Sequence, residues 1–544
     1  MATADHPPPI VPFNATSSLA ELQVCTEDDV RRVIMGSPTK SCSLDPIPTT
    51  ILKECIDVLI VFLTAMCNAS LTEGHLPQSQ RHAVVTPLLK KLHLDQAELK
   101  NYRPVSNLSF MSKVVERMVA ERLNQYLQVH DLMPRLQSAY RRHHSTETAL
   151  LRVISDLCSS ADNREVSLLG LLDLSAAFDC VDHDILLSRL EKTFGITEVA
   201  LSWIRSFLTT RTQQVCFGGV LSAISQITCG VPQGSVLGPL LYLLYTAELF
   251  QIIAEDGLNA HSYADDTQVY ISSRADSALI VVQRFTRCVQ RIDDWMTCNR
   301  LKMNADKTQL IWVGTRQQLA KVKIDGIQMI AAHVSVSNTV SNLGVQLDDQ
   351  LTMNSHVSAL CRSCFFQLRQ LWTVRRSLTT EVTKTLVHAF ISSRLDYCNS
   401  LLFDIGEGLL NKLQHIQNSA ARLVTGTRKF EHITPVLCAL HWLPIRQRIR
   451  FKIATIVYKC LHGLAPSYLA DDCILISSMI GRRQLRSASS QLLFIPRTRT
   501  ANLGPRAFGV SGPTVWNSLP AALHDPGLSI SAFRKRLKTY LFCV

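Results

Sequence analysis

The sequence has no apolar run of the ~20 residues that a membrane-spanning helix requires. The longest candidate, residues 58–66, is too short and is better interpreted as a buried helix. The N-terminus, Met1-Ala2-Thr3-Ala4-Asp5-His6-Pro7, has neither the basic start nor the apolar segment of a secretory signal. We therefore expect no membrane partner and an intracellular protein of the nucleus and cytoplasm.

The spacing of the cysteines does not indicate a disulfide framework. There are 17, an odd number, scattered along the chain, which is typical of reduced thiols inside cells. Cys361 and Cys364 make a lone CxxC pair with no second pair nearby, so a zinc site is not favoured. Charged residues are also few, at 18% against 47% hydrophobic, which excludes a disordered chain. The 544 residues are enough for more than one domain.

Acidic residues are scarce in the last fifth of the chain. From His441 to the C-terminus, fifteen Lys and Arg stand against three Asp, whereas residues 1–440 hold 41 basic and 41 acidic residues. The net charge of +12 therefore arises in the C-terminal segment. A concentrated basic segment indicates a polyanionic partner, because neutralised phosphates release counterions. A solvated basic surface would give the same composition.

Short strands and helices follow each other without an internal repeat. The predicted strands lie at 83–89, 101–105, 166–174, 213–217, 224–228, within 301–312, and at 341–345. The predicted helices lie at 27–34, 51–71, 112–126, 145–157, 184–193, 199–208, 240–249, 277–297 and 531–541, and residues 354–464 are mainly helical.

Two adjacent carboxylates, Asp265 and Asp266, lie between short segments rich in aromatic and β-branched residues. Such flanks favour strands, so residues 261–270 predict a β-hairpin with both carboxylates at its tight turn. Two like charges side by side repel each other unless a cation lies beside them, and Mg²⁺ prefers such hard oxygen ligands. Asp-Asp at a turn is also common without a metal, so the pair alone does not establish a metal site.

Two other features extend this pattern. Asp173 ends the apolar run at 166–174, where a charge is costly unless it is paired, hydrogen-bonded or bound to metal. The Gly/Pro loop at 229–239 leads into a helix and lets backbone approach a ligand closely. A carboxylate that caps the next turn would also explain Asp173, and most such loops are only turns. If strand and hairpin are neighbours in one sheet, the three carboxylates converge on a site for two divalent ions about 4 Å apart.

The ordered set of motifs carries more information than any one of them. The set is Asn101-Tyr102-Arg103-Pro104, Gln137-Ser138-Ala139-Tyr140-Arg141, 173–179, 230–239, 263–266, 304–307 and 343–345. It resembles the palm of reverse transcriptases, specifically those of non-LTR (LINE-type) retrotransposons. The resemblance runs from about residue 30 to the C-terminus, where Val515-Trp516-Asn517-Ser518-Leu519-Pro520 is similar to the family's C-terminal region.

The resemblance implies an α+β right-hand polymerase fold. Fingers and palm, with a small antiparallel sheet packed on helices, would occupy residues 71–347, after an N-terminal segment at 1–70. A helical thumb-like region at 348–465 and a basic nucleic-acid-binding region at 466–544 would follow. The implied activity is RNA-directed DNA polymerisation, which extends a primer 3′-hydroxyl by two-metal-ion nucleotidyl transfer. The implied partners are an RNA template, a DNA primer or nicked target DNA, dNTPs and two Mg²⁺ ions, which Mn²⁺ can replace.

The resemblance also assigns catalytic roles. Asp173, Asp265 and Asp266 look like the metal carboxylates, with Asp173 and Asp265 favoured as direct ligands. Phe178 looks like the steric gate, a ring under the sugar that excludes a 2′-hydroxyl. Lys307 stands where the family has a lysine that neutralises or protonates the departing pyrophosphate. A salt-bridging surface lysine is the alternative interpretation of Lys307.

Four further residues would bind the nucleotide. Gln233 and Gly234 look like nucleotide-positioning residues on the loop, and Arg103 and Lys90 would contact the triphosphate. For each basic residue, a solvated surface position accounts equally well for its presence.

The chain departs from the family in two ways. It begins just before the polymerase, with no N-terminal endonuclease, and it has no Cys/His zinc-knuckle cluster near the C-terminus. We therefore expect a 5′-truncated copy or a partial gene model, whose endonuclease would have to come from elsewhere.

Two alternatives to a reverse transcriptase remain open. A palm-type RNA-dependent RNA polymerase shares the three aspartates, but Phe178 at the gate and Ala264 before the pair disfavour it. A catalytically silent nucleic-acid-binding remnant of a truncated element would act through the basic tail. The intact aspartates and Gln233 disfavour that remnant.

Overall fold

A computed structural model describes residues 18–40, 42–175, 177–329, 332–479 and 491–544. The chain forms two compact units, and each unit is assembled from separate stretches of sequence. The first unit comprises Met1–Tyr140, Asp173–Glu255 and Val289–Asn304, and the second comprises Arg141–Leu172, Asp256–Cys288 and Ala305–Val544. Three arginines of the basic segment, Arg482, Arg483 and Arg486, lie outside the described residues.

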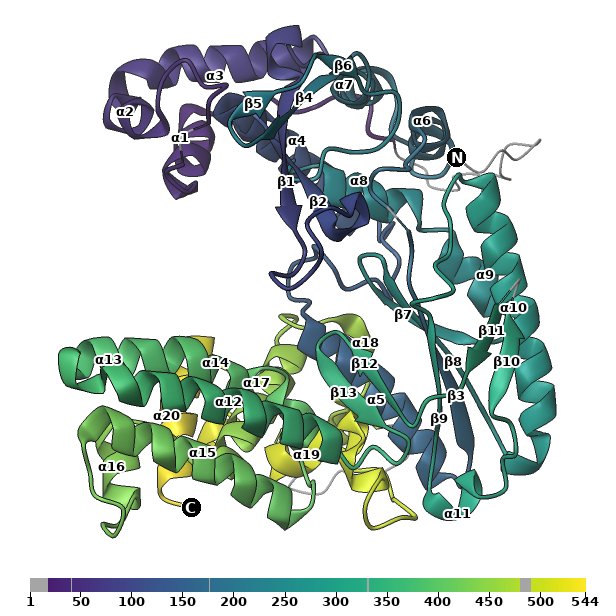
Figure 1. The fold of residues 1–544 in the computed structure, drawn as a ribbon, viewed down its shortest axis with the longest axis vertical. Helices are drawn as coiled ribbons and strands as arrows, with labels where there is room; N and C mark the ends of the chain where they lie inside the picture. The colour runs from purple at the N-terminus through teal and green to yellow at the C-terminus, as the bar shows by residue number, and fades with distance from the viewer. Residues whose placement is uncertain (1–17, 41, 176, 330–331, 480–490) are drawn as a thin grey trace. The chain divides into compact units, whose positions relative to one another are not determined.

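The first unit is mainly helical (Figure 1). Its helices are α1 (Glu27–Gly36), α2 (Thr49–Glu54), α3 (Ile56–Thr72), α4 (Phe110–Val129), α6 (His183–Lys192), α7 (Glu198–Leu208), α8 (Gly238–Tyr245) and α9 (Leu249–Glu255). Side-chain caps fix several helix starts: Ser109 accepts a hydrogen bond from the Ser112 amide, at 3.2 Å, at the start of α4. The helix predicted at 51–71 is two helices, α2 and α3, which meet at Cys55.

The sheet of the first unit has the strand order β2-β1-β4-β5, with β6 also paired to β4. The strands are β1 (His82–Leu89), β2 (Tyr102–Asn107), β4 (Thr212–Phe217), β5 (Val220–Leu221) and β6 (Ser225–Gln226). Strand β1 pairs antiparallel with β2 and parallel with β4. The β1–β2 hairpin places Leu88 opposite Arg103, so the predicted extended pieces at 83–89 and 101–105 are paired strands.

A four-stranded antiparallel sheet of order β7-β8-β3-β9 forms one part of the second unit. Its strands are β3 (Val166–Leu172), β7 (Asn259–Tyr263), β8 (Asp266–Ser273) and β9 (Gln309–Val313). The central strand β3 is almost wholly buried, as its apolar run predicts.

Helices cover both faces of this sheet. On one face, the Tyr270 hydroxyl donates to Asp156 of α5 (Thr146–Asp162) at 2.5 Å. Gly170 points to the opposite face, because it lies next to Leu169, the partner of Tyr270, and alternate residues of a strand face opposite ways. There a Cβ on Gly170 would come within 2.5 Å of the Phe285 ring of α10 (Ala278–Cys298), so only glycine fits. Charged side chains on these strands are therefore confined to their ends.

The remaining elements of the second unit follow β9. Two short hairpins, β10 (Gly326–Met329) with β11 (Ala332–Ser335) and β12 (Thr339–Asn342) with β13 (Val345–Asp348), come after α11 (Arg316–Leu319). The helices that follow, green to yellow in Figure 1, are α12 (Asn354–Val374), α13 (Thr380–Val387), α14 (Ser393–Asp396), α15 (Glu407–Thr425), α16 (Thr434–Ala439), α17 (Ile445–Leu461), α18 (Ser467–Ala470), α19 (Phe508–Asn517) and α20 (Ile530–Phe542). None of the described helices combines the length and apolar character that crossing a membrane demands.

The prediction of a continuous strand at 341–345 is wrong, because a turn interrupts it at its centre. Leu343 and Gly344 form a two-residue turn between β12 and β13, with Asn342 opposite Val345. Both turn residues have positive φ, 45° and 82°, the pattern of a hairpin turn whose twist matches its strands. The Leu343 carbonyl accepts a hydrogen bond from Tyr397 at 2.6 Å, which helps to hold the turn.

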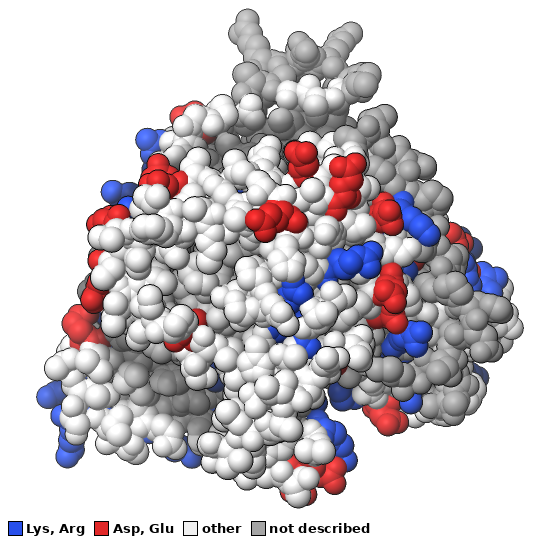
Figure 2. All heavy atoms as spheres, turned by 90° about the horizontal axis from the view of Figure 1, so that it is seen from above, with Lys and Arg blue, Asp and Glu red and all other residues white. Residues whose placement is uncertain are grey.

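The mixture of helices with small sheets confirms the predicted α+β class. Acidic and basic side chains are interspersed on the face drawn in Figure 2, with uncharged surface between them.

Candidate active site

The adjacent carboxylates lie at the tip of the β7–β8 hairpin, as predicted. Tyr263 pairs with Asp266, so Ala264 and Asp265 form a two-residue turn. Ala264 has a φ of 59°, a left-handed conformation that costs a non-glycine residue roughly 1–2 kcal/mol. Asp265 is partly exposed and Asp266 is exposed. The strained turn therefore presents both carboxylates to solvent.

The sheet of the second unit brings other predicted residues to the same edge. Leu172, the last residue of β3, pairs with Thr267, and Leu171 pairs with Gln309 at the start of β9. This edge is therefore where β3 ends and where β8 and β9 begin. Lys307 lies in an exposed turn two residues before Gln309, so it reaches the edge that carries the hairpin tip.

Asp173 directly follows Leu172 in the chain and is partly exposed. It is the first residue of a segment of the first unit, and its carbonyl accepts a hydrogen bond from the Asn304 amide at 2.9 Å. Over the described ranges, no group of three or more His, Cys, Asp or Glu side chains is arranged to hold a metal ion. The hairpin thus offers a pair of carboxylates, which fits Mg²⁺, an ion commonly held by one or two carboxylates together with water and substrate phosphates.

The Gly/Pro loop of the first unit is fastened to the segment after Asp173. The Val231 amide donates to the Phe178 carbonyl at 2.9 Å, and the Gln233 side-chain amide donates to both Asp179 oxygens at 2.9 and 3.0 Å. Burial raises the pKa of Asp179, and the hydrogen bond from Gln233 opposes this shift. The Phe178 ring stacks on Tyr242, with ring centroids 4.6 Å apart. The predicted gate and the predicted nucleotide-positioning residue therefore belong to one connected group.

The same loop is seated on β2. The Ser106 amide donates to the Gln233 carbonyl at 2.7 Å, and Gly234 has a φ of 123°. A Cβ on Gly234 would lie 2.6 Å from the Ser106 carbonyl oxygen, so this contact requires glycine. Strand β2 also carries Arg103, whose side chain is exposed.

Lys90 follows β1 directly, at the end of the hairpin where residues 90–101 connect β1 to β2. Its backbone amide donates to the Asn101 carbonyl at 2.8 Å, and its side-chain amine donates to the Lys100 carbonyl at 2.7 Å. Lys90, Arg103, Phe178, Gln233 and Gly234 therefore lie on connected strands and loops of the first unit.

Sequence reasoning missed Glu116, on α4. Its side chain is fully buried, and one oxygen accepts hydrogen bonds from the Val236 and Leu237 amides at 2.6 and 3.2 Å. The other oxygen accepts from Ser112 at 3.2 Å. Burial raises the pKa of Glu116, while the charge of Arg211 and the backbone hydrogen bonds oppose the shift. Glu116 thus holds the segment that directly follows Gln233 and Gly234.

Sequence reasoning also gave no role to Asp179, although it lies within the quoted 173–179 motif. Its place in this motif is the signal that could have identified Asp179 from the sequence. For Glu116 there is no such signal, because nothing in the sequence distinguishes it from an ordinary polar residue of an amphipathic helix.

The comparisons with known proteins find the same family that the motifs resemble. Residues 89–347 match the family model "Reverse transcriptase (RNA-dependent DNA polymerase)", a range that contains every predicted site residue. The chain is 26% identical over 415 residues to the RNA-directed DNA polymerase from mobile element jockey of Drosophila melanogaster. It is 28% identical over 411 residues to the probable RNA-directed DNA polymerase from transposon BS of the same species.

These matches cover 74% and 73% of the chain, and 44% of each relative. A retrovirus-related Pol polyprotein from the type-1 retrotransposable element R1 of Bradysia coprophila is 25% identical over 394 residues, which are 70% of this chain and 38% of that protein. The chain thus spans less than half the length of these relatives. Residues 89–347 are thus similar to reverse transcriptases, and the relatives named here are polymerases or Pol polyproteins of mobile elements.

Proposed function

We propose that this chain is an RNA-directed DNA polymerase of a LINE-type retrotransposon, which extends a primer 3′-hydroxyl with dNTPs on an RNA template. One observation carries the proposal. The hairpin β7–β8, which carries Asp265 and Asp266 at its tip, pairs through β8 with β3, and β3 ends immediately before Asp173. All of these strands lie inside the segment that matches the reverse transcriptase family. This is the strand arrangement that the three-carboxylate hypothesis requires.

In this proposal Asp173, Asp265 and Asp266 hold two Mg²⁺ ions, which Mn²⁺ can replace. When bound, the ions neutralise the triphosphate and lower the pKa of the primer 3′-hydroxyl. The 3′-hydroxyl would lose its proton to solvent water, its oxygen would bond to the α-phosphorus, and the bond from that phosphorus to pyrophosphate would break. Lys307, at the same edge of the sheet as the hairpin tip, neutralises or protonates the departing pyrophosphate.

Selection of the nucleotide falls to residues of the first unit. The Phe178 ring, held by its stack on Tyr242, excludes a 2′-hydroxyl, and Arg103 and Lys90 contact the triphosphate. Gln233 and Gly234 position the incoming nucleotide. Because both Asp179 oxygens accept from the Gln233 side-chain nitrogen, Asp179 would fix the orientation in which Gln233 meets the nucleotide.

The finer architecture is part of the proposal. Fingers and palm would lie within 71–347, a helical thumb within 348–465, and a basic nucleic-acid-binding region within 466–544. The partners would be an RNA template, a DNA primer or nicked target DNA, and dNTPs. Copying onto nicked chromosomal DNA would place the protein in the nucleus after its synthesis in the cytoplasm.

Primer extension tests the proposal. Purified protein is incubated with MgCl₂, an RNA template, an annealed DNA primer and dNTPs, beside the isosteric variant Asp265→Asn/Asp266→Asn. A matched control is Glu27→Gln/Asp28→Asn, which neutralises an adjacent, exposed acidic pair in the first turn of α1. We expect extension by the wild type and the control, and loss of at least a hundredfold in the hairpin variant.

The alternative function is a catalytically silent remnant that binds nucleic acid through its basic tail. It predicts tight, salt-sensitive binding of the template without extension by any of the three proteins. Extension that the hairpin variant retains would instead contradict the assignment of the carboxylates.

A further inference from the structure

The helical part of the second unit contains a cavity of about 530 Å³. Its walls come from the π-turn His388–Ser392, the end of α14, the loop at 441–443, α17 and α20. Basic side chains dominate the lining, and Asp396 is its single acidic residue. This volume lies within the ~300–1,000 Å³ range of typical ligand sites.

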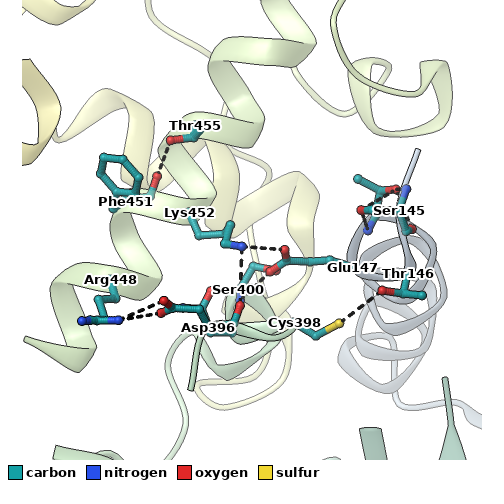
Figure 3. A network of polar contacts seen from close by, with 12 residues as sticks. Ser145, Thr146, Glu147, Asp396, Cys398, Ser400, Arg448, Phe451, Lys452 and Thr455 are labelled. Atoms are coloured by element: carbon teal, nitrogen blue, oxygen red, sulfur yellow. Dashed lines mark hydrogen bonds and ion pairs between the residues drawn. The ribbon is translucent and has the colours of Figure 1, made fainter. Parts of the chain in front are cut away.

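Two of the basic side chains have internal partners. Arg448 donates to both Asp396 oxygens at 2.9 Å, and Lys452 pairs with Glu147 at 3.1 Å. Glu147 also accepts from the Ser400 hydroxyl at 2.7 Å, and Figure 3 shows these contacts as one continuous network. Arg448 and Lys452 are therefore charge-compensated and tie α17 to the neighbouring segments.

Three cations of α20 are in a different situation. Arg534, Lys535 and Lys538 line the cavity, and none has a carboxylate partner within the part of the chain that the structure describes. Helix α20 itself is firmly packed, since Phe533 and Leu537 are fully buried. A fixed helix therefore presents three uncompensated positive charges to the cavity.

The cavity also has unsatisfied polar walls. Trp442 and Asn399 line it and are only 4% and 3% exposed. The Trp442 indole N–H and the Asn399 carbonyl oxygen have no hydrogen-bond partner among the described residues. Buried polar atoms without partners are rare in folded proteins, and these two belong to residues at the wall of the cavity.

The local field is positive. Burial lowers the pKa of His388, and the charges of Arg448 and Lys384 lower it further, while Asp396 opposes them. Arg534 lies over the Phe451 ring, 5.8 Å from its centroid, which holds the planar guanidinium in place. A planar guanidinium beside two ammonium groups is a suitable set for phosphate oxygens.

We propose that this cavity binds the phosphodiester backbone of a single-stranded nucleic acid, with Arg534, Lys535 and Lys538 as its phosphate ligands. The partner class rests on the proposed function. The three cations spread over ~6 Å along the helix, more than one phosphate group spans, which favours a strand over a lone anion. The site would anchor template or primer strand through the C-terminal helix.

Salt-dependent binding tests the site without any catalysis. A fluorescein-labelled single-stranded RNA is titrated with full-length protein by fluorescence anisotropy, in EDTA and without dNTPs, at several KCl concentrations. The proteins are the wild type, Arg534→Ala/Lys538→Ala, and the control Arg497→Ala/Arg536→Ala, which removes two exposed cations that do not line the cavity.

Two lost single-strand contacts should reduce the slope of log K against log [KCl] by about 1.4 in the cavity variant. The control should keep the wild-type slope. An unchanged slope in the cavity variant, or an equal decrease in the control, overturns the proposal. If the double variant does not fold, as judged by circular dichroism, Lys535→Ala alone should reduce the slope by about 0.7.

Two further titrations distinguish a bound strand from a lone phosphate, and strand binding from polymerase activity. Inorganic phosphate at matched ionic strength should not displace the RNA. Displacement confined to proteins with an intact cavity would overturn the strand assignment in favour of a lone phosphate. The Asp265→Asn/Asp266→Asn variant should bind RNA as the wild type does, so the binding site and the polymerase activity can fail independently.

Discussion

Replacing Glu116 by alanine should damage both the fold and the use of dNTPs. The Glu116 carboxylate accepts from the backbone amides of Val236 and Leu237, which follow Gln233 and Gly234 in the loop. Arg211, also fully buried, has its pKa lowered to about 10 by burial, while the charge of Glu116 raises it. Glu116 therefore fixes the loop and compensates a buried cation.

The magnitude follows from what each substitution leaves behind. Glu116→Ala leaves two backbone amides without acceptors, at about 1–3 kcal/mol each, and leaves Arg211 without its nearby negative charge. Together these effects should lower the free energy of unfolding by about 3–5 kcal/mol. Glu116→Gln keeps an oxygen for the two amides but, like Glu116→Ala, removes the negative charge near Arg211, so it should cost less than Glu116→Ala and still be destabilising.

Two assays separate stability from positioning. Chemical denaturation of the full chain measures the free energy of unfolding, and steady-state primer extension measures KM and kcat for dNTP. Because the loop after Gln233 shifts when its anchor is lost, we expect Glu116→Gln to raise KM for dNTP severalfold with a smaller change in kcat. The matched controls are Glu121→Ala and Glu121→Gln on the same helix, where the side chain is 49% exposed.

The reasoning is refuted if Glu116→Ala is no more destabilised than Glu121→Ala. A destabilised Glu116→Gln with unchanged KM for dNTP would confine Glu116 to a structural role. Both measurements are needed, because a fall in activity alone could come from partial unfolding.

Three further predictions follow from named contacts. Phe178→Ala should raise incorporation of rNTPs relative to dNTPs at least tenfold in primer extension, because the proposed gate, the ring stacked on Tyr242, is then missing. An unchanged ratio would reject Phe178 as the steric gate. Arg189→Met should lower the free energy of unfolding by about 3–5 kcal/mol, because it leaves the buried Glu248, which pairs with Arg189 at 2.6 Å and is 6% exposed, as an uncompensated charge. In denaturation experiments the double variant Arg189→Met/Glu248→Leu should regain most of this stability. No regain would contradict the ion-pair account. Burial lowers the pKa of His261 to about 3, so below pH ~6.5 the unfolded chain binds a proton at this residue and the native state does not. The free energy of unfolding should therefore fall by about 1.4 kcal/mol per pH unit between pH ~6.5 and pH ~3. His261→Gln should flatten this dependence in denaturation curves at pH 7 and 5, and identical slopes for the two proteins would exclude His261 as the source.

Local features of the fold were predictable because local chemistry determines them. Aromatic and β-branched residues around Asp265 and Asp266 predicted a hairpin, and the tight turn at Ala264 and Asp265 confirms it. The apolar run before Asp173 predicted a buried central strand, and β3 has helices on both faces. In each case, neighbours in sequence supply the pattern.

Other features depend on partners that are distant in sequence. The pairing of β3 with β8 joins residues such as Leu172 and Thr267, and only the resemblance to a family suggested it. Glu116 has the same polar character as the exposed residues of α4, and only the packing of the loop against this helix reveals its role. The sequence predicted a strand through Leu343 and Gly344, whereas the positive φ angles of both residues make a turn.

The position of the carboxylates follows from the packing of the sheet that carries them. Tyr270 contacts Asp156 on one face, and Gly170 leaves room for Phe285 on the other, so neither face of β3 or β8 offers solvent to a charge. A carboxylate one residue further into β8 would replace the buried Thr267 and would cost several kcal/mol without a partner. Acidic residues can therefore stand only where the strands end, and there the antiparallel register brings the end of β3 beside the start of β8. The buried sheet thus determines where charge can gather, and the identity of the residues at that edge determines which chemistry it serves.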